Sequence, residues 1–445
     1  MARREDRSWW SRAAAFVTAT VVVLAPSASR AEEPLSLEQA LHLALTRNER
    51  ALKAPLRIEA AEGSLDRART AFYPTVLGQG AGVWSSIPDR GGRSITGAGT
   101  LTVNQPILNP SAFPLYGQAK HNLASERWGA AEDLRVLAFD TTNAFLSACS
   151  QEQLVRAAQQ RVDRAKSDRD DSAARAAAGL ASTNDVTRAS VAVATAESQL
   201  ANARGNAERA LLSLSFLVGQ PVVGSLVAPD RTTTSARRTD WNREDVVKNA
   251  EARRPDLRSA TEHVEALRDF AKEPMYRLIP TLGIAGQIRE IFDPLPTDRA
   301  TSENVQLTLT WTIYDAGVRY ADKRVRLAQA ESGSLDERAL RRSVATDIAL
   351  ALASLHAARE IFRIADEAVA AAQKNTEETA ILYKQGLAKA IEVTDANASR
   401  YDADVTRATA KLTMEQAYLN LRYALGLGPI DQALPSAESA GGGAK

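Results

Sequence analysis

Cysteine and aromatic residues are scarce in this sequence, and each shortage limits the class of protein. Cys149 is the single cysteine among 445 residues, so no disulfide can form within the chain. Aromatic residues make up 5% of a chain that is 44% hydrophobic, because alanine supplies much of the apolar content. Small side chains let helices approach closely, so this composition favours helix–helix seams over a deep globular core.

An excess of charge of one sign is also missing. The chain has 55 lysine and arginine residues against 54 aspartate and glutamate residues, a formal net charge of +1. Proteins that bind nucleic acid over a wide area present a basic surface. The balance therefore predicts no nucleic-acid partner.

Proline is absent from two long segments, residues 115–220 and 297–428. A proline inside a helix costs about 3 kcal/mol, so its absence over such lengths is expected of long helices. Each segment has one break near its middle, at Gly179 and at Gly386. We therefore predict two antiparallel helical hairpins, with helices of about 55 residues and roughly 80 Å in length.

Residues 1–31 have the pattern of a secretory signal peptide. Basic residues precede an apolar run at 13–24, and small residues at Ser29 and Ala31 fit a signal peptidase site. This run is too short to cross a bilayer as a helix, which needs about 20 residues. No later run of about 18 apolar residues follows. The sequence thus predicts an exported chain in which only strands would enter a membrane.

The sequence repeats itself at a shift of 206 to 207 residues. Tyr73-Pro74 aligns with Ile279-Pro280, and Gly219 aligns with Gly426. A tandem repeat of this length indicates two copies of one structural unit. Copy one is 32–220, with a helix at 37–70, strands at 75–84 and 95–107, and a helical hairpin at 115–218 whose tip lies near 179–184.

A linker at 221–240 joins the first copy to the second. Copy two is 241–428, with a helix at 244–272, strands at 281–291 and 303–313, and a helical hairpin at 318–426 whose tip lies near 386–391. Residues 429–445 end in a glycine-rich stretch and are predicted to be a disordered tail.

The predicted strands alternate between apolar and polar side chains. In 303–313 every second residue from Val305 to Ile313 is apolar, and Thr, Asn or Gln occupies the positions between. This alternation over about ten residues is typical of a transmembrane β-barrel, but a half-buried soluble hairpin alternates in the same way. Four strands cannot close a barrel alone, so the membrane interpretation requires oligomerisation.

Motifs for catalysis and metal binding do not occur. His42, His121, His263 and His356 are scattered without metal-ligand spacing. The glycine-rich stretches adjoin strands rather than a helix that would cradle phosphate. We therefore predict no enzyme, no cofactor and no metal site.

Several short motifs occur twice and in the same order. They are the helix 37–52, the Tyr73-Pro74 strand start, the segment 105–109 with its repeat 311–317, and the two tips 179–186 and 383–396. This doubled order resembles the TolC family of outer-membrane efflux and secretion channels. The resemblance implies a mostly α fold with a small β part. Long antiparallel coiled-coil hairpins would form a periplasmic α-barrel, and four strands per chain would join a trimeric twelve-stranded transmembrane β-barrel.

The same resemblance implies a function and a set of partners. Three identical chains would form an exit duct in the outer membrane that extends across the periplasm, for efflux of small molecules or for type I secretion. The partners would be outer-membrane lipid, a periplasmic adaptor (membrane fusion protein) and an inner-membrane transporter of the RND, ABC or MFS type. The alternative is a soluble periplasmic coiled-coil scaffold or adaptor, although an adaptor usually has one helical hairpin rather than two in tandem.

The resemblance also assigns site residues at the tips. Glu392 and Asp395 match the acidic ring of the periplasmic aperture, and their spacing places both carboxylates on one helix face. The alternative is that this face is an ordinary solvated helix surface. Tyr383 and Asp185 match a tip latch, in which Lys389 would replace the usual basic residue because Ala388 occupies that position. The adaptor would dock on the tip residues Gly179, Leu180, Ala181, Ser182, Gly386, Leu387 and Ala388.

Overall fold

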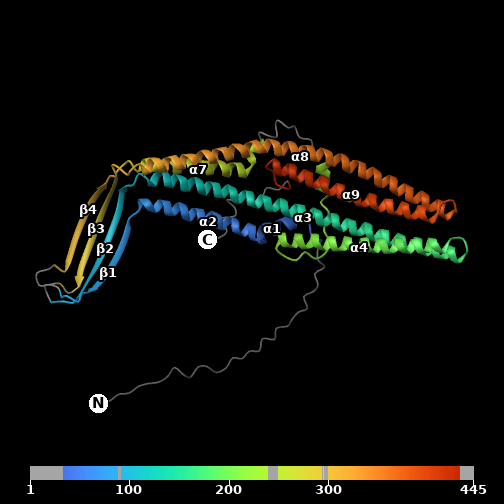
Figure 1. The fold of residues 1–445 in the computed structure, drawn as a ribbon, viewed down its shortest axis with the longest axis horizontal. Coiled ribbons are helices and arrows are strands. Elements are labelled where there is room, and N and C mark those ends of the chain that lie inside the picture. The colour runs from blue at the N-terminus through green and yellow to red at the C-terminus, as the bar shows by residue number, and fades with distance from the viewer. Residues whose placement is uncertain (1–33, 89–91, 239–248, 293, 295–298, 431–445) are drawn as a thin grey trace, which may run out of the picture.

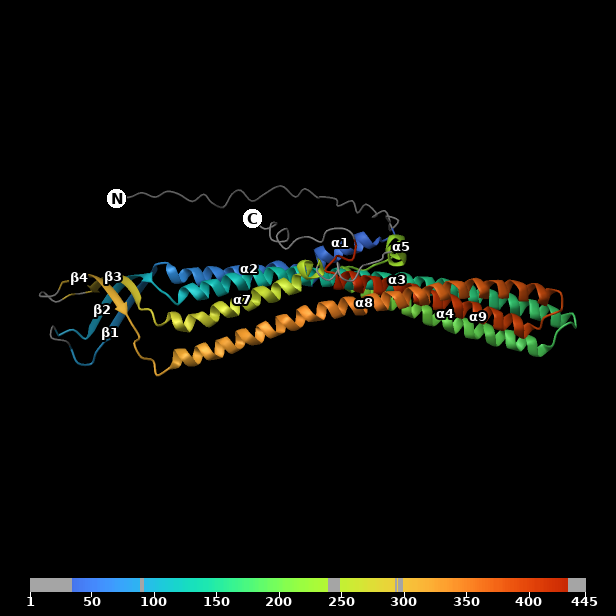
Figure 2. The ribbon, with the colours of Figure 1, turned by 90° about the horizontal axis from the view of Figure 1, so that it is seen from above.

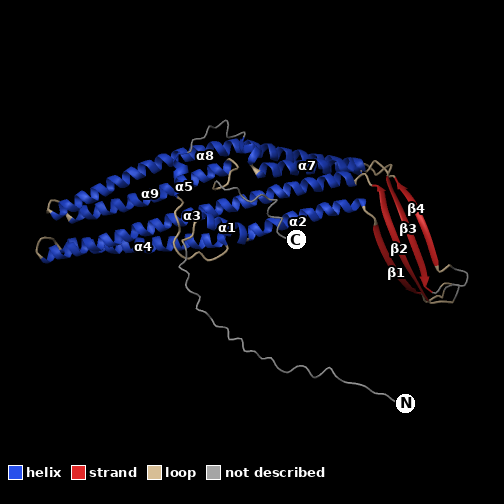
Figure 3. Ribbon diagram, turned by 180° about the vertical axis from the view of Figure 1, so that it is seen from behind, coloured by secondary structure: helices blue, strands red, loops and turns tan. Residues whose placement is uncertain are grey.

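The computed structural model describes residues 34–88, 92–238, 249–292, 294 and 299–430. The molecule is elongated, with a four-stranded sheet at one end, long helices running from it, and two hairpin turns at the other end (Figures 1 and 3). The predicted class, mostly helical with a small β part of four strands, is confirmed. The predicted signal peptide and residues 431–445 of the predicted tail lie outside the described residues.

The sheet joins the two copies of the repeat. Strands β1 (Thr75–Trp84), β2 (Ile95–Leu108), β3 (Thr281–Phe292) and β4 (Thr301–Thr310) pair antiparallel in the order β1-β2-β3-β4. The central pair, β2 with β3, combines the two copies, and β1 and β4 form the sheet edges. The prediction that the last strand reaches residue 313 was wrong. Strand β4 ends at Thr310 because its partner β3 begins opposite that residue.

The register divides the sheet into two chemically different faces. Ile284 pairs with Leu307, and on the opposite face Gln287 pairs with Asn304, whose Nδ2 donates to the Gln287 Oε1 at 3.4 Å. Paired residues point to the same side of a sheet, and side chains alternate along each strand. Every residue of β1 and β4 is exposed. The apolar face carries Val76, Trp84, Ile95, Leu101, Val103, Leu282, Ile284, Ile288, Phe292, Val305, Leu307 and Leu309.

Each copy contains one helical hairpin, and its two helices differ strongly in length. In the first, α3 (Ala112–Ala177) has 66 residues and α4 (Thr183–Val218) has 36. In the second, α8 (Val318–Lys384) has 67 residues and α9 (Ala390–Ala424) has 35. The prediction of helices of about 55 residues was therefore wrong. Figure 2 shows the short helices α4 and α9 only along the tip side of the molecule.

Two glycines end the short helices. Gly219 after α4 has φ 74°, and Gly426 closely follows α9 with φ 70°, both in the left-handed region that ends helices. The sheet-side parts of α3 and α8 pack instead against α2 (Glu49–Arg69) and α7 (Pro255–Tyr276). Each long helix thus changes partner partway along its length.

The predicted helix at 37–70 is divided into α1 (Leu37–Arg47) and α2. Asn48 lies between them in an extended conformation, accepts from the Arg50 backbone N–H at 2.9 Å, and donates to the Leu217 carbonyl at 2.9 Å. The predicted helix at 244–272 is also interrupted, because Arg254 is extended before Pro255, and α7 continues to Tyr276. A residue before proline avoids the helical region, so this break follows from local sterics.

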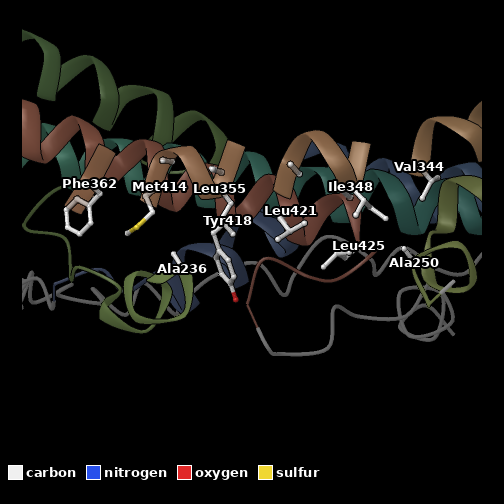
Figure 4. Close-up of a cluster of buried hydrophobic side chains, with 14 of the residues drawn as sticks. Ala236, Ala250, Val344, Ile348, Leu355, Phe362, Met414, Tyr418, Leu421 and Leu425 are labelled. Atoms are coloured by element: carbon white, nitrogen blue, oxygen red, sulfur yellow. The ribbon is translucent and has the colours of Figure 1, made fainter. Parts of the chain in front are cut away.

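The region predicted as a linker contains a helix, α5 (Asp230–Arg238). Its Ala236 is fully buried beside α8 and α9, and its carbonyl accepts from the Arg359 Nε at 2.6 Å. Figure 4 shows Ala236 facing the buried side chains Met414 and Tyr418. The predicted linker therefore includes a helix that covers the α8–α9 core.

Small residues dominate the helix seams, as the composition predicted. In α4, the buried positions from Ala189 to Ala203 are spaced four and three residues apart in alternation, which is typical of a coiled coil. Alanine at these positions lets the helix axes approach closely. The buried seam residues of α4 are Ala189, Val193, Ala196, Leu200, Ala203, Leu214 and Val218.

Candidate functional site at the hairpin tips

Both hairpins turn through the same backbone motif. Gly179 has φ 73°, and the N–H of Leu180 donates to the Arg175 carbonyl at 2.8 Å. Gly386 has φ 79°, and the N–H of Leu387 donates to the carbonyl five residues earlier at 2.9 Å. This six-to-one bond around a left-handed residue is the Schellman motif, which favours glycine because glycine has no Cβ.

The tips present apolar side chains to solvent. Leu180 is 78% exposed and Leu387 is 73% exposed, each directly after its glycine. Ala181 and Ala388, the next residues, are half-buried. Leu180 and Leu387 occupy equivalent positions of the repeat, so each tip presents one exposed leucine side chain to solvent.

The returning helices begin differently at the two tips. Ser182 caps α4, since its Oγ accepts from the Asn184 N–H and its own N–H donates to the Asp185 Oδ2, each at 3.2 Å. Lys389 occupies the N-cap position of α9 and makes no side-chain cap bond. Asp185 thus has a local structural role at the start of α4, in addition to the latch role predicted for it.

A cavity of about 220 Å³ lies between the two hairpins just behind the tips. All four hairpin helices contribute to it, so residues far apart in the sequence meet here. The lining residues are Asp168, Ser172, Asp185, Arg188, Ala189, Tyr383, Ala390, Ile391, Val393, Thr394 and Asp395.

Tyr383 and Asp185, the predicted latch pair, both line this cavity. Within the described chain the buried Tyr383 Oη has no hydrogen-bond partner. The Tyr383 ring instead lies under Arg175, whose guanidinium carbon is 4.2 Å from the ring centroid. Arg175 comes from α3 and Tyr383 from α8, so this cation–π contact joins the two hairpins. The exposed side chain of Lys389 lies at the start of α9.

Asp168 of α3 is the acidic residue that the sequence interpretation missed. Its Oδ2 accepts from the Asn397 Nδ2 of α9 at 2.7 Å. Burial raises the pKa of Asp168, and the nearby Asp171 charge raises it further, while Asn397 and Arg164 act in the opposite direction. Asp168 and Asn397 are 229 positions apart, so no local pattern in the sequence indicates their contact.

Glu392 and Asp395 lie in the first two turns of α9, and both are exposed. Asp395 also lines the cavity between the hairpins, whereas Glu392 is not among its lining residues. The two carboxylates are therefore on the solvent side of the tip, next to the seam that joins the hairpins.

Metal sites and membrane-spanning helices are both missing from the described part of the chain. In residues 34–88, 92–238, 249–292 and 299–430, no three histidine, cysteine, aspartate or glutamate residues are grouped to hold a metal ion. Among the helices of those segments, none combines the length and the apolar character that a membrane crossing requires. Cys149 is buried, and burial raises its pKa to about 12, which keeps the thiol protonated and unreactive.

The sequence matches the family model described as outer membrane efflux protein over residues 40–220 and 246–427. No curated protein matches the sequence. Similar solved structures include a membrane protein from Pseudomonas aeruginosa, with 18% identity, a TM-score of 0.75, and coverage of 88% of this chain and 90% of that one.

Two further similar structures are those of outer membrane channels. The CmeC outer membrane channel from Campylobacter jejuni is 15% identical, with a TM-score of 0.76 and coverage of 90% of this chain and 88% of that one. The MtrE outer membrane channel from Neisseria gonorrhoeae, in its open state, is 18% identical, with a TM-score of 0.75 and coverage of 88% and 89%. Likeness at this level of identity shows a shared fold.

Proposed function

The chain belongs to the outer membrane efflux protein family, and we propose that three copies form one exit duct through the outer membrane and across the periplasm. Membership makes the chain an outer membrane channel rather than an enzyme. Family membership alone does not establish the trimer, its partners or the roles of the tip residues, and these are what we propose.

The observation that carries the proposal is the sheet with an exposed apolar face. Val305, Leu307 and Leu309 alternate along β4 and are 77%, 64% and 63% exposed. A soluble sheet buries such a face against its own core, whereas lipid solvates it. Ten-residue strands match the about 9–11 residues that cross a bilayer at a tilt.

The unpaired edges of the sheet support association into a trimer. Strands β1 and β4 each have one side without a partner strand in the described chain. Unpaired N–H and C=O groups are costly in lipid, so β4 of one copy pairs with β1 of the next until the sheet closes. Three copies give the closed sheet of twelve strands that the TolC resemblance implies.

The long helices then cross the periplasm. A helix of 66 residues such as α3 extends about 100 Å at 1.5 Å per residue. In this arrangement the tips point away from the outer membrane. The exposed leucines Leu180 and Leu387 offer the docking surface for a periplasmic adaptor, which connects the duct to an inner-membrane transporter of the RND, ABC or MFS type.

The tip residues are proposed to control passage. Three copies of Glu392 and Asp395 form an acidic ring at the aperture, which concentrates cations there. Tyr383, whose Oη has no hydrogen-bond partner among the described residues, forms a latch with Asp185 or with Lys389 of a neighbouring copy. Efflux of small molecules and type I secretion both fit such a duct.

Membrane fractionation with heat-modifiable gel mobility tests the trimer. The signal-cleaved protein is expected in the outer-membrane fraction as a trimer that resists mild detergent and dissociates on boiling. A soluble periplasmic monomer would instead support the scaffold or adaptor function, with the strands forming a globular sheet.

A further inference from the structure

The polar face of the sheet carries a single charged side chain, that of Arg289 on β3. The charged residues of strands β1 to β4 are Arg289, Glu290 and Glu303. Glu303 pairs with Ile288 of the apolar face, and Glu290 follows that isoleucine by two positions, so both carboxylates lie on the apolar side. Arg289 pairs with Ser302 and lies on the opposite side. The fixed charge of the polar face along these four strands is therefore positive.

Arg289 is exposed, and among the described residues it has neither a hydrogen-bond partner nor an ion-pair partner. Its cross-strand neighbours on the polar face are Thr100 of β2 and Ser302 of β4, whose hydroxyl groups are uncharged. A guanidinium stays protonated at every pH at which proteins fold. The charge of Arg289 is therefore permanent, and within the described part of the chain no carboxylate neutralises it.

Arg289 lies near the end of the sheet that is remote from the helices. Strand β3 begins at Thr281, soon after α7, and ends at Phe292, close to Arg289. Figure 1 shows that this end of the sheet and the hairpin tips are at opposite ends of the molecule. In the duct proposed above, the tips open to the periplasm, so Arg289 is at the outer opening.

We propose that Arg289 sets the charge preference of the outer opening, which favours anionic solutes and repels cationic ones. The inference rests on the proposed duct, in which the polar face lines the water-filled lumen. Threefold symmetry places three copies of Arg289 at one level of this lumen, and fixed charges of one sign around an opening concentrate ions of the other sign. Because the proposed aperture at the tips is acidic, the two ends of the duct would have opposite charge preferences.

A cysteine placed beside Arg289 measures the local electrostatic potential. Ser302→Cys provides a thiol whose Cβ lies about 4.5–5.5 Å from that of Arg289 across the strands. The native Cys149 is buried and its thiol stays protonated, so thiol reagents report on the new cysteine. The signal-cleaved protein is placed in lipid nanodiscs, which leave both ends of the duct accessible, at about 10 mM salt, where charges act over about 30 Å. Its reaction rates are measured with anionic sulfonatoethyl and cationic trimethylammonioethyl methanethiosulfonate.

The ratio of the anionic rate to the cationic rate is the measurement, because any change in the reactivity of the thiol itself alters both rates equally. Adding Arg289→Gln to the Ser302→Cys protein is expected to lower this ratio about threefold or more, whereas Arg289→Lys should keep it. Glu303→Gln removes a charge from the opposite face and should change the ratio much less. Thr308→Cys is the position control, since it lies on the polar face about 20 Å farther along β4 and should not respond to Arg289→Gln.

Salt provides a second measurement that needs no change at Arg289. At about 1 M salt the screening length is about 3 Å, so the ratio at Ser302→Cys should fall toward the value of the Arg289→Gln protein. A ratio that is the same with and without Arg289→Gln, or that does not depend on salt, would overturn the role of Arg289.

Val305→Cys separates failure of this inference from failure of the duct. Val305 is on the apolar face, so lipid should protect its replacement thiol from both charged reagents. Rapid reaction at this position would contradict lipid contact and hence the duct itself. Slow reaction there, combined with a ratio at Ser302→Cys that does not depend on Arg289, would overturn the charge preference of the outer opening alone.

Discussion

Arg135 of α3 stacks on Tyr423 of α9, with its guanidinium carbon 4.2 Å from the ring centroid. Its Nη1 also donates to the Tyr423 backbone carbonyl at 2.8 Å. Glu132 completes the cluster, since it accepts from Arg135 at 2.8 Å and from the Tyr423 Oη at 2.9 Å. These three residues join the two copies of the repeat midway along the molecule, and Arg135 is only 3% exposed.

Replacing Arg135 by methionine is expected to lower stability by about 3 kcal/mol, because it leaves the Glu132 carboxylate, which is only 13% exposed, without its cation. The thermal midpoint of the detergent-purified protein measures the loss. Arg363→Met on α8 is the matched control, since this arginine pairs with Glu360 and Glu367 on an exposed surface. The control should change the midpoint little. Equal losses in both variants would remove Arg135 from this structural role.

Gly219 and Gly426 should tolerate alanine poorly and to a similar degree. Both have positive φ, and an added Cβ would lie 3.2 Å from the Arg47 Cβ or 3.1 Å from the Arg253 Cβ. The left-handed backbone alone costs a non-glycine residue about 1–2 kcal/mol. Gly205→Ala is the control, because this glycine lies inside α4 with open space around it. That change should stabilise the helix by about 0.5–1 kcal/mol. The thermal midpoint should therefore rise for Gly205→Ala and fall for Gly219→Ala and Gly426→Ala.

The two faces of β4 should respond differently to arginine. Leu307→Arg places a charge on the apolar face and is expected to cost about 2–4 kcal/mol if that face meets lipid. Thr308→Arg places the same charge on the opposite, polar face and should be tolerated. The yield of heat-modifiable trimer in the outer-membrane fraction is the measurement. Equal yields from both variants would argue against contact between the apolar face and lipid.

Removing the tip carboxylates should weaken cation selectivity. Glu392→Gln with Asp395→Asn removes six charges from the proposed trimeric aperture, and the preference for cations in planar-bilayer conductance should fall about twofold or more. Asp163→Asn with Glu208→Gln removes as many charges from exposed positions on α3 and α4 and serves as the control. Unchanged selectivity in the tip variant would place Glu392 and Asp395 outside the aperture.

Asp168 should make tip stability depend on acidity. Its pKa is raised in the folded state, mainly by burial, so folding favours the protonated form. This contribution is present below the unfolded value of 3.8 and is lost as the pH rises through the folded value. The thermal midpoint of the original protein should therefore fall relative to that of Asp168→Asn as the pH increases above about 4.

The control for this effect is Asp170→Asn, because Asp170 is 68% exposed and pairs with its neighbour Arg169. Its midpoint should follow that of the original protein across the same pH range. A constant difference between Asp168→Asn and the original protein at all pH values would show that Asp168 acts through its hydrogen bond to Asn397 rather than through its charge.

The sequence was sufficient for features that depend on local backbone chemistry. Gly179 and Gly386 supply the left-handed residue that a tight helix end requires, so both turns were predictable. The start of each first strand after Pro74 and Pro280 was equally local. By contrast, Asn48 and Pro255 interrupt helices whose apolar spacing continues on both sides. The apolar spacing therefore predicted one continuous helix in each case.

Other features required contacts between distant parts of the chain. The short α4 and α9 end at glycines that lie against Arg47 and Arg253 of preceding helices, so their lengths depend on packing between elements. Helix α5 has a polar sequence that resembles a linker, and burial of Ala236 against the α8–α9 core makes it part of the fold.

By itself, then, the sequence determined the repeated unit, the proline-free helices, the glycine turns and the alternating strands, because each follows from one residue's backbone preference or from a fixed spacing. Only the tertiary structure decided which side chains meet between the hairpins. Asp168 with Asn397, Arg175 with Tyr383 and Arg135 with Tyr423 each join residues more than 200 positions apart. Such contacts depend on how two long helices are aligned along their whole length, and no local pattern specifies that alignment.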